Sequence, residues 1–240
     1  MGRGQIRPLC RAVSSVTFAE RFLPLTEAQA AREIIEVCKC LHQKNLLAAA
    51  DGNVSYRLSE DRILITPTGQ HKAYLEPHEM AVINSNGDVL EGQPSSERLM
   101  HLEIYRHCPK ARCIVHAHPP VATAWTIARP FLERLPSDAL PEVTLAVGQI
   151  PIVPYARPST EAMGTHLRKF LPRHRVMILA RHGAVSWGES TIEAYNGMER
   201  LEHASEILRL AHTLGRVSPL PPEELHALQA MRAARGDKTL

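Results

Sequence analysis

Short apolar strands alternate with helical patterns along almost all of this chain, and this alternation constrains the fold more than any other feature. In the helical segments apolar residues recur at the helical period, whereas the strand segments are short apolar runs bounded by turn residues. The expected helices span residues 27–47, 95–107, 121–128, 160–171, 191–214 and 223–234. The expected strands span 54–58, 63–66, 80–84, 111–118, 150–153, 176–180 and 184–187, with another from Val89 after an Asn86-Gly87 hairpin turn. This order predicts an α/β fold in which helices cover a mixed sheet.

Length and composition exclude several classes of protein. The 240 residues suit one large domain, and 44% of them are hydrophobic, which is enough for a substantial core. A net charge of +3 and only 5% aromatic residues argue against a nucleic-acid partner. The five cysteines are odd in number and lack Cys-x-x-Cys spacing, so we expect reduced thiols and a cytoplasmic protein.

The two ends of the chain differ from its middle. Residues 1–24 carry Arg3, Arg7 and Arg11 but no continuous apolar segment, so we expect a loose N-terminal extension and no secretory signal. No apolar run is long enough to span a bilayer, and we expect no membrane partner. Residues 216–240 are expected to form a proline-containing linker followed by a short helix.

Two histidines at the end of an apolar strand, His116 and His118, are the first indication of chemistry. Side chains alternate across a strand, so residues two apart leave the same face together. Imidazole nitrogen is a preferred zinc ligand, and a catalytic zinc site needs three protein ligands and an open position. The pair therefore predicts two ligands of a metal site, although an ordinary polar strand end before Pro119-Pro120 fits the same residues.

Two further residues are candidates to complete this site. His182 follows the apolar run 176–180 and precedes Gly183, which places it in a turn at a strand end, where ligands are common. Glu97 stands in the first turn of the expected helix 95–107, where the helix dipole also favours an acid for structural reasons. His101, one turn beyond Glu97, is an alternative ligand that we rank lower and interpret as a supporting or packing residue.

Three short loops contain the small hydroxyl and glycine residues that suit a phosphate group. They are 52–55, 66–69 and Ser95-Ser96, and Lys72 adds a positive charge near the second. Free backbone amides and small hydroxyls let donors converge on an anion without steric bulk. Each loop alone is a common turn pattern, but Ser95 and Ser96 directly precede Glu97, which predicts a phosphate site beside the metal site.

These motifs occur in a fixed order along the chain. They are Gly52-Asn53-x-Ser55, Ile65-Thr66-Pro67-Thr68-Gly69, Pro94-Ser95-Ser96-Glu97, Met100-His101, His116-x-His118-Pro119, Pro154-Tyr155-Ala156, His182-Gly183-Ala184 and Glu199-Arg200-Leu201-Glu202-His203. As a set they resemble the class II aldolase/adducin family, and within it the L-fuculose-1-phosphate aldolase branch, from about residue 27 to residue 215. The resemblance implies a three-layer α/β/α fold around a mostly antiparallel sheet, with a class II aldolase-like domain over 25–215. It also implies a homotetramer with active sites at subunit interfaces.

The resemblance assigns roles by position. It implies that His116, His118 and His182 bind a divalent metal, usually Zn²⁺, although another divalent metal is possible. It implies that Glu97 is the catalytic base and binds the metal when substrate is absent. The residues implied to hold the substrate phosphate are Asn53, Thr68, Gly69, Ser95 and Ser96.

The implied activity is cleavage of a ketose 1-phosphate to dihydroxyacetone phosphate and an aldehyde. Candidate substrates are fuculose 1-phosphate, 5-deoxyribulose 1-phosphate and 5-methylthioribulose 1-phosphate. The acid that protonates the aldehyde oxygen is not identified. In this branch a tyrosine about twenty residues beyond the second histidine has that role, and residues 135–142 contain no tyrosine. Glu142 is the candidate substitute, although a solvated loop acid is the ordinary interpretation of that residue.

Three alternatives remain open. Related methylthioribulose-1-phosphate dehydratases have a glutamate in the region of Glu142, so a dehydratase on the same zinc scaffold is the main alternative. A pentulose-5-phosphate epimerase ranks lower, because that branch has a different motif at Ser95-Ser96-Glu97. A non-catalytic adducin-like head ranks lowest, because such heads lack the full set of metal histidines.

Overall fold

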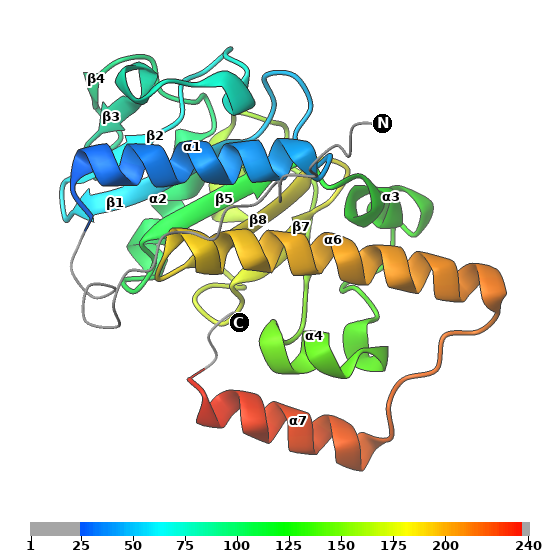
Figure 1. The fold of residues 1–240 in the computed structure, drawn as a ribbon. Coiled ribbons are helices and arrows are strands. Elements are labelled where there is room, and N and C mark those ends of the chain that lie inside the picture. Colours follow the sequence, from blue (N-terminus) through cyan, green and yellow to red (C-terminus); the bar gives the residue numbers. More distant parts are fainter. Residues whose placement is uncertain (1–24, 237–240) are drawn as a thin grey trace, which may run out of the picture.

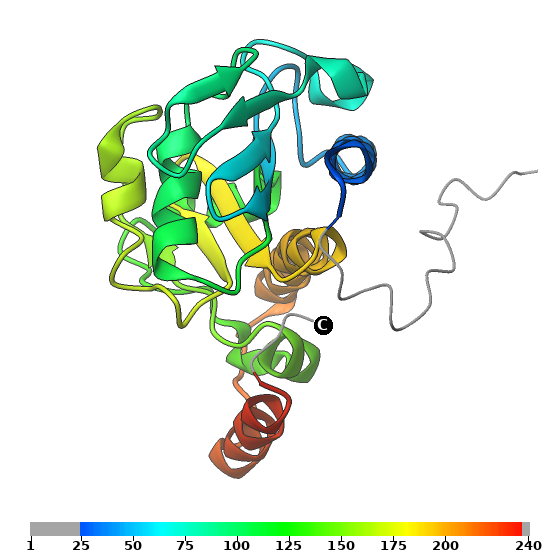
Figure 2. The same ribbon diagram turned by 90° about the vertical axis from the view of Figure 1, so that its left-hand side faces the viewer.

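The computed structural model describes residues 25–236, which form one sheet between two layers of helices (Figure 1 and Figure 2). The strands are β1 (Asn53–Ser59), β2 (Arg62–Ile65), β3 (Ala81–Ile83), β4 (Val89–Glu91), β5 (Cys113–Ala117), β6 (Ile152–Val153), β7 (Val176–Leu179) and β8 (Gly183–Gly188). The α-helices are α1 (Glu27–Gln43), α2 (Arg98–His107), α3 (Pro120–Ala128), α4 (Pro141–Ala146), α5 (Glu161–Thr165), α6 (Thr191–Leu214) and α7 (Pro222–Ala234). Short 3₁₀ helices are η2 (Lys72–Tyr74), η3 (Pro77–Glu79) and η4 (Ser137–Ala139).

The sheet has eight strands in the order β4-β3-β2-β1-β5-β8-β7-β6. Every neighbouring pair is antiparallel except β6 and β7, which run parallel. The expectation of a mostly antiparallel sheet is therefore confirmed. The histidine strand β5 lies near the middle, between β1 and β8, with His116 paired to Asn53 on one side and to Val185 on the other.

Side chains of β5 alternate between the two helical layers, as the strand period requires. Cys113, Val115 and Ala117 belong to the apolar cluster that contains α1 and α6, whereas Ile114 belongs to the cluster that contains α2 and α5. Figure 2 shows α1 and α6 on one side of the sheet and α2 and α5 on the other. The expected three-layer α/β/α arrangement is therefore present, and the face toward α2 is the face to which His116 points.

Three expected helix boundaries are wrong. The first helix ends at Gln43 instead of residue 47, because the chain turns there and Asn45 adopts a left-handed φ of 59°. The helix expected over 160–171 ends at Thr165 and continues as turns, in which Leu167 N–H bonds the Gly164 carbonyl. The helix expected from residue 95 begins at Arg98, so Glu97 is its N-cap residue and does not lie in its first turn.

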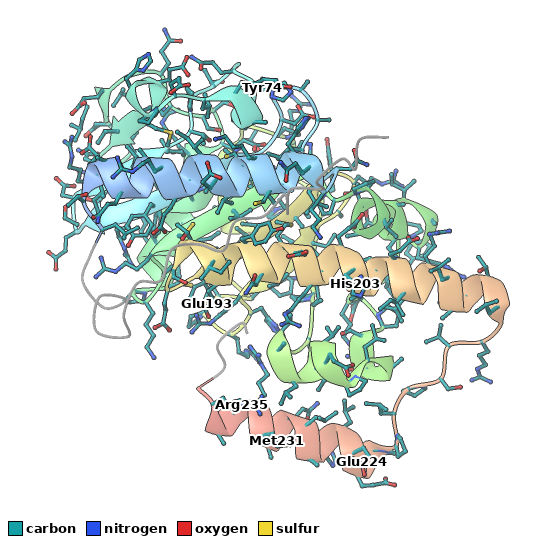
Figure 3. All side chains as sticks on the ribbon, in the orientation of Figure 1. Tyr74, Glu193, His203, Glu224, Met231 and Arg235 are labelled. Atoms are coloured by element: carbon teal, nitrogen blue, oxygen red, sulfur yellow. The ribbon has the colours of Figure 1, made fainter. Side chains whose placement is uncertain are left out.

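One α-helix, α4, was not predicted from the sequence at all, and helix α7 packs against it. Helix α4 begins at Pro141 and has only six residues, which is too short for a helical period to be visible in the sequence. Helix α7 packs against α4, where the Arg232 guanidinium donates to the Leu145 carbonyl at 3.2 Å. Most of α7 faces outward, and Met231 is 48% exposed (Figure 3).

The remaining chain-wide expectations are tested only over residues 25–236. Cys38, Cys108 and Cys113 are buried free thiols, as expected, and Cys10 lies outside the described residues. Within this range no helix combines the length and hydrophobicity needed to cross a bilayer. The expected extension over 1–24 also lies outside the described residues.

Candidate metal centre and active site

Three imidazoles that are distant in the sequence meet at one end of the sheet. His116 is on β5, His118 is the first residue after that strand, and His182 lies in the turn between β7 and β8. Their ring centroids are 4.9 to 5.0 Å apart, and one nitrogen from each ring can be chosen so that all three lie within 4.8 Å of one another. His116 is fully buried, whereas the His118 side chain is 26% exposed, so the cluster opens toward solvent on one side.

Two glycines let neighbouring segments approach the histidine strand. A Cβ atom on Gly183 would lie 2.4 Å from the Ala117 carbonyl oxygen and 2.8 Å from the His118 ring. Gly52 has a left-handed φ of 69°, and a Cβ atom there would lie 2.8 Å from the His116 carbonyl oxygen. Neither distance is possible for a larger residue without movement of the backbone. Both turns therefore need glycine at these positions, because they lie so close to the backbone of β5.

Contacts behind two of the three rings, His116 and His118, show which nitrogen of each faces the centre. His116 Nδ1 lies 2.8 Å from the Ala184 carbonyl, which only accepts, so Nδ1 carries the proton and the neutral ring has a lone pair on Nε2. His118 Nδ1 lies 3.4 Å from Asp51 Oδ2, which leaves Nε2 of that ring directed at His116 Nε2, 3.2 Å away. A carboxylate or carbonyl behind a histidine is the usual partner of a metal ligand.

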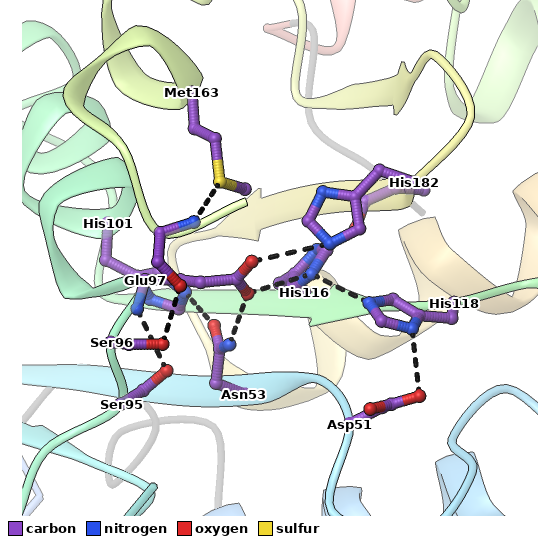
Figure 4. A network of polar contacts seen from close by, with 12 residues as sticks. Asp51, Asn53, Ser95, Ser96, Glu97, His101, His116, His118, Met163 and His182 are labelled. Atoms are coloured by element: carbon purple, nitrogen blue, oxygen red, sulfur yellow. Dashed lines mark hydrogen bonds and ion pairs between the residues drawn. The ribbon is translucent and has the colours of Figure 1, made fainter. Parts of the chain in front are cut away.

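Electron-rich atoms therefore face one another across a short gap (Figure 4). Glu97 Oε2 lies 3.1 Å from His116 Nε2, and Glu97 Oε1 lies 3.3 Å from His182 Nε2. Burial lowers the pKa of His182 to about 4 and also lowers the pKa of His118, so both rings are neutral at pH 7. Lone pairs and a carboxylate at these distances repel one another unless a cation lies between them. The donor set thus fits a divalent metal held by three imidazoles and a carboxylate.

Glu97 is positioned by its place at the start of α2 and by Asn53 on β1. The Asn53 Nδ2 group donates to Glu97 Oε2 at 2.8 Å, and the Glu97 backbone N–H donates to Ser95 Oγ at 3.3 Å. Burial would raise the pKa of Glu97, but its contact with His116, the hydrogen bond from Asn53 and the nearby His182 ring hold the pKa well below its usual range. The carboxylate is therefore ionised at neutral pH and can accept a proton or bind a metal.

A line of buried polar side chains extends from Asn53 into the protein. His101 Nε2 lies 2.5 Å from Asn53 Oδ1, and His101 Nδ1 lies 2.7 Å from Ser55 Oγ. Ser55 Oγ lies 2.8 Å from the Tyr105 hydroxyl. His101 therefore contacts Asn53 and Ser55 and is not one of the three clustered histidines. Ser55 was identified only as part of a loop, and nothing in the sequence indicated Tyr105.

The three expected phosphate loops lie together next to Glu97. Thr66 joins them, because its hydroxyl accepts from the Val54 N–H at 3.2 Å and its carbonyl accepts from the Ser95 N–H at 3.1 Å. The Thr68 N–H bonds the Gln93 carbonyl at 3.0 Å, which places the second loop alongside the third. The expected phosphate residues differ in exposure. Thr68, Gly69 and Ser96 are exposed, whereas Ser95 and Asn53 are buried.

Two other residues of interest lie in different surroundings. Lys72 is buried beneath the phosphate loops, and its ammonium donates to the carbonyls of Ala50 at 2.9 Å and Gln70 at 2.7 Å. It therefore ties the 66–72 segment to the turn before β1. Glu142 is exposed in the first turn of α4, an element that supplies none of the residues described above.

Comparisons with known proteins place the chain among sequence relatives. Residues 32–208 match the family described as Class II Aldolase and Adducin N-terminal domain. The chain is 32% identical to the 3-oxo-tetronate 4-phosphate decarboxylase of Escherichia coli K12, over 73% of this chain and 84% of that one. It is 30% identical to the methylthioribulose-1-phosphate dehydratase of Methylococcus capsulatus, over 78% of this chain and 96% of that one.

A solved structure extends the comparison to the fold. The crystal structure of L-fuculose-1-phosphate aldolase from Thermus thermophilus superposes with a TM-score of 0.69 at 32% identity. The match covers 79% of this chain and 98% of that one. The three similar proteins thus share one fold family while differing in the bond that each acts on.

Proposed function

Because this chain belongs to the class II aldolase and adducin family, we propose that it is a divalent-metal-dependent lyase that acts on a phosphorylated ketose. The proposed reaction cleaves a ketose 1-phosphate to dihydroxyacetone phosphate and an aldehyde, with Zn²⁺ as the proposed metal. Proposed substrates are fuculose 1-phosphate, 5-deoxyribulose 1-phosphate and 5-methylthioribulose 1-phosphate. The observation that carries the proposal is the convergence of His116, His118 and His182 on the Glu97 carboxylate.

The proposed roles follow from the contacts of each residue. The three histidines hold the metal, which when bound supplies Lewis-acid stabilisation of negative charge on substrate oxygens. Glu97 moves the proton at the carbon next to the ketone, since it is the carboxylate that lies beside the cluster. The loops that contain Thr68, Ser95 and Ser96 hold the phosphate, which keeps the reacting carbons in place at a distance from the breaking bond.

The bond changes require one proton transfer on each fragment. When the bond between C3 and C4 of the ketose breaks, its electron pair stays on C3 and forms an enediolate, while the C4 hydroxyl loses its proton and becomes an aldehyde. Glu97, after it takes up a proton from water, passes that proton to C3, which gives dihydroxyacetone phosphate, while the proton from the C4 hydroxyl goes to a second base. The C4 hydroxyl needs a separate base, and we propose Glu142 for this role, supplied by a neighbouring subunit of a homotetramer.

A second candidate reaction is decarboxylation, and one feature of the chain favours it. Loss of CO₂ from a carbon next to a ketone leaves an enediolate of the same kind, but the leaving group has no proton to give up. No tyrosine lies in 135–142, where the fuculose branch has its acid, and decarboxylation needs no such group. The similarity to 3-oxo-tetronate 4-phosphate decarboxylase supports the same candidate.

The dehydratase remains the alternative on the same scaffold, supported by the similarity to methylthioribulose-1-phosphate dehydratase. Dehydration removes water from the substrate and leaves all its carbons in one product. It requires an acid for the departing hydroxyl, and Glu142 is the candidate. If Glu142 acts in either reaction, Glu142→Gln will slow turnover strongly, whereas Glu60→Gln at an exposed turn will not.

Proton exchange on dihydroxyacetone phosphate tests the proposal without knowledge of the aldehyde. The Zn²⁺-loaded protein is incubated with this compound in D₂O, and loss of the carbinol C–H signal is followed by proton NMR. We expect exchange, because forming the enediolate is the reverse of the last step of cleavage. Glu97→Gln should keep the metal and lose at least about a hundredfold in exchange rate, which is the scale of general-base catalysis.

The outcomes separate the candidates. Exchange by the wild-type protein and not by Glu97→Gln supports a lyase that forms dihydroxyacetone phosphate. Absence of exchange, together with water loss from 5-methylthioribulose 1-phosphate, would favour the dehydratase. A panel of ketose 1-phosphates assayed for aldehyde, and of phosphorylated 3-oxo acids assayed for CO₂, then distinguishes cleavage from decarboxylation.

A further inference from the structure

The donors and acceptors around Asn53 can be assigned in only one way. The ionised Glu97 carboxylate only accepts hydrogen bonds, so the Asn53 group 2.8 Å from it must be the amide N–H. The other end of the Asn53 side chain is then its carbonyl oxygen, which accepts. His101 Nε2, 2.5 Å from that oxygen, must therefore carry a proton. This chain of requirements begins at the carboxylate and ends at the His101 ring.

The protonation state of the His101 ring does not change this assignment. In the neutral ring, Nε2–H donates to Asn53 and Nδ1 accepts from the Ser55 hydroxyl at 2.7 Å. In a protonated ring, Nε2–H still donates to Asn53, and Ser55 instead accepts from Nδ1 and donates to Tyr105 at 2.8 Å. Full burial of His101 lowers its pKa to about 3, so the neutral ring is the form at pH 7.

The assembly is enclosed and comes from two facing elements. His101 and Ser55 are fully buried, Tyr105 is 5% exposed and Asn53 is 3% exposed. Ser55 and Asn53 are two residues apart on β1 and so share a face, whereas His101 and Tyr105 are four apart on α2 and share a helical face. Buried polar groups at this depth are costly to leave unpaired, which holds each of them in one orientation.

We propose that His101 is a positioning residue for Glu97, acting through Asn53. Its Nε2–H keeps the Asn53 amide turned so that a donor faces Glu97. Without it the amide can rotate and present its oxygen to the carboxylate, which would push Glu97 away from His116 and His182. The inference rests on the proposed function for the role of Glu97, but the hydrogen bonds on which it depends are independent of that role.

The test uses the Zn²⁺-loaded protein and proton exchange on dihydroxyacetone phosphate. His101→Leu removes the Nε2–H donor and puts an apolar side chain of similar size in its place. His101→Gln instead retains an N–H group near the position of Nε2. We expect His101→Leu to lower the exchange rate about 10- to 100-fold with little change in KM, since partners that orient metal-site groups have effects of this size. His101→Gln should recover most of the rate, and the exposed His78→Gln should match wild type.

A double-mutant cycle separates this role from a purely structural one. In an Asn53→Ala background, His101→Leu should cause little further loss, because the group through which it acts is gone. A structural role would give additive losses in both backgrounds. Wild-type exchange rates in His101→Leu, or additive losses in the cycle, would overturn the proposal.

Nitrogen NMR of the ring provides a readout that does not need activity. In protein labelled with ¹⁵N-histidine, His101 should show a protonated Nε2 and an unprotonated Nδ1 at pH 7, and Asn53→Ala should shift the Nε2–H resonance. An unprotonated Nε2 would refute the inference even if exchange occurs. Absence of exchange by the wild-type protein, with the expected ring spectrum, would instead count against the proposed function and leave the hydrogen-bond assignment intact.

Discussion

At the scale of single residues, the site brings together imidazole nitrogens and a carboxylate, which repel one another when no cation lies between them. His116 is fully buried, its Nδ1 bonds the Ala184 carbonyl, and its Nε2 faces the Glu97 carboxylate and the His118 ring. Asp51 lies behind His118 in the same way that Ala184 lies behind His116. The His116 and His118 rings thus each have a partner at the back, which leaves the other ring nitrogen directed inward. Metal binding should therefore depend on each ring individually.

Replacing one ring tests this dependence. His116→Ala should remove the metal from the purified protein, with a loss in affinity greater than about a hundredfold, because the buried ligand has no substitute nearby. Elemental analysis after dialysis against a defined Zn²⁺ concentration measures the effect. His203→Ala, at an exposed position on α6, is the matched control and should retain about one ion per chain. Full metal content in His116→Ala would exclude this residue as a ligand.

At the scale of elements, two tight connections determine whether the ligands meet. The turn between β7 and β8 holds His182, and it lies against β5 only because residue 183 has no side chain. The backbone N–H of Arg181, whose φ of 61° is left-handed, donates to the Thr126 hydroxyl on α3 at 2.8 Å. The turn is thus fixed from both sides, which explains how a loop residue can complete a site on a strand.

A methyl group at position 183 should separate the ligands. In Gly183→Ala the new Cβ would meet the Ala117 carbonyl, so the turn must move away from β5 and carry His182 with it. We expect weaker Zn²⁺ binding by calorimetry and a loss of about 1–3 kcal/mol in unfolding free energy. Gly215→Ala, where a Cβ has open space at the end of α6, should change neither quantity. Unchanged Zn²⁺ affinity in Gly183→Ala would contradict the role assigned to this turn.

An ion pair between α2 and the turns that follow α5 predicts sensitivity to acid. The Arg168 guanidinium donates to the buried Glu103 carboxylate at 2.5 Å, and this bond lowers the pKa of Glu103 below its usual value. Stability from a lowered carboxylate pKa is present above the unfolded-state value of about 4.3 and is lost as the pH falls through the folded-state value. Glu103→Gln should therefore reduce unfolding free energy by about 1 kcal/mol at pH 7, a modest value because Arg168 is half exposed.

Denaturant titrations at several pH values measure this effect. The difference between Glu103→Gln and wild type should begin to shrink as the pH falls below about 4, because the unfolded wild-type chain then binds a proton at Glu103, and it should vanish once the folded-state carboxylate is protonated as well. The exposed Glu60→Gln is the control and should follow the wild-type curve throughout. A constant difference at all pH values would show that the loss comes from packing and not from charge.

The sequence predicted most of these elements because their patterns are local. The side chains of His116 and His118, at the end of β5, face one side because side chains alternate along a strand. This prediction required no knowledge of the rest of the fold. The exact ends of α1 and α5 depend on turns stabilised by contacts elsewhere, and α4 is too short to show a period. The link from Asn53 through His101 to Tyr105 joins β1 to α2, and no local pattern reports such a contact.

At the scale of the whole molecule, the candidate metal joins three distant parts of the chain. Glu97, His116 and His182 come from the start of one helix, the central strand and a turn near the far side of the sheet. A ligand that binds only this folded arrangement stabilises all of it by mass action. The fold and the site are therefore coupled in both directions, and stability should depend on metal concentration.

Thermal unfolding measures this coupling. Zn²⁺ at about 100 times its dissociation constant should add about 2.7 kcal/mol to the unfolding free energy. For a chain of this size the midpoint should rise by roughly 5–10 °C relative to protein treated with a chelator. His116→Ala should unfold at the same temperature with and without Zn²⁺. An equal rise in that variant would mean that the ion stabilises the protein from another place.

The separation of the ligands in the chain also has a consequence for biosynthesis. A ribosome that has released the polypeptide only as far as His118 has delivered one carboxylate and two imidazoles, at positions 97, 116 and 118. The last donor, at position 182, emerges after α3, α4, β6, α5 and β7. An ion that needs all of these donors would therefore bind only after most of the polypeptide has been translated.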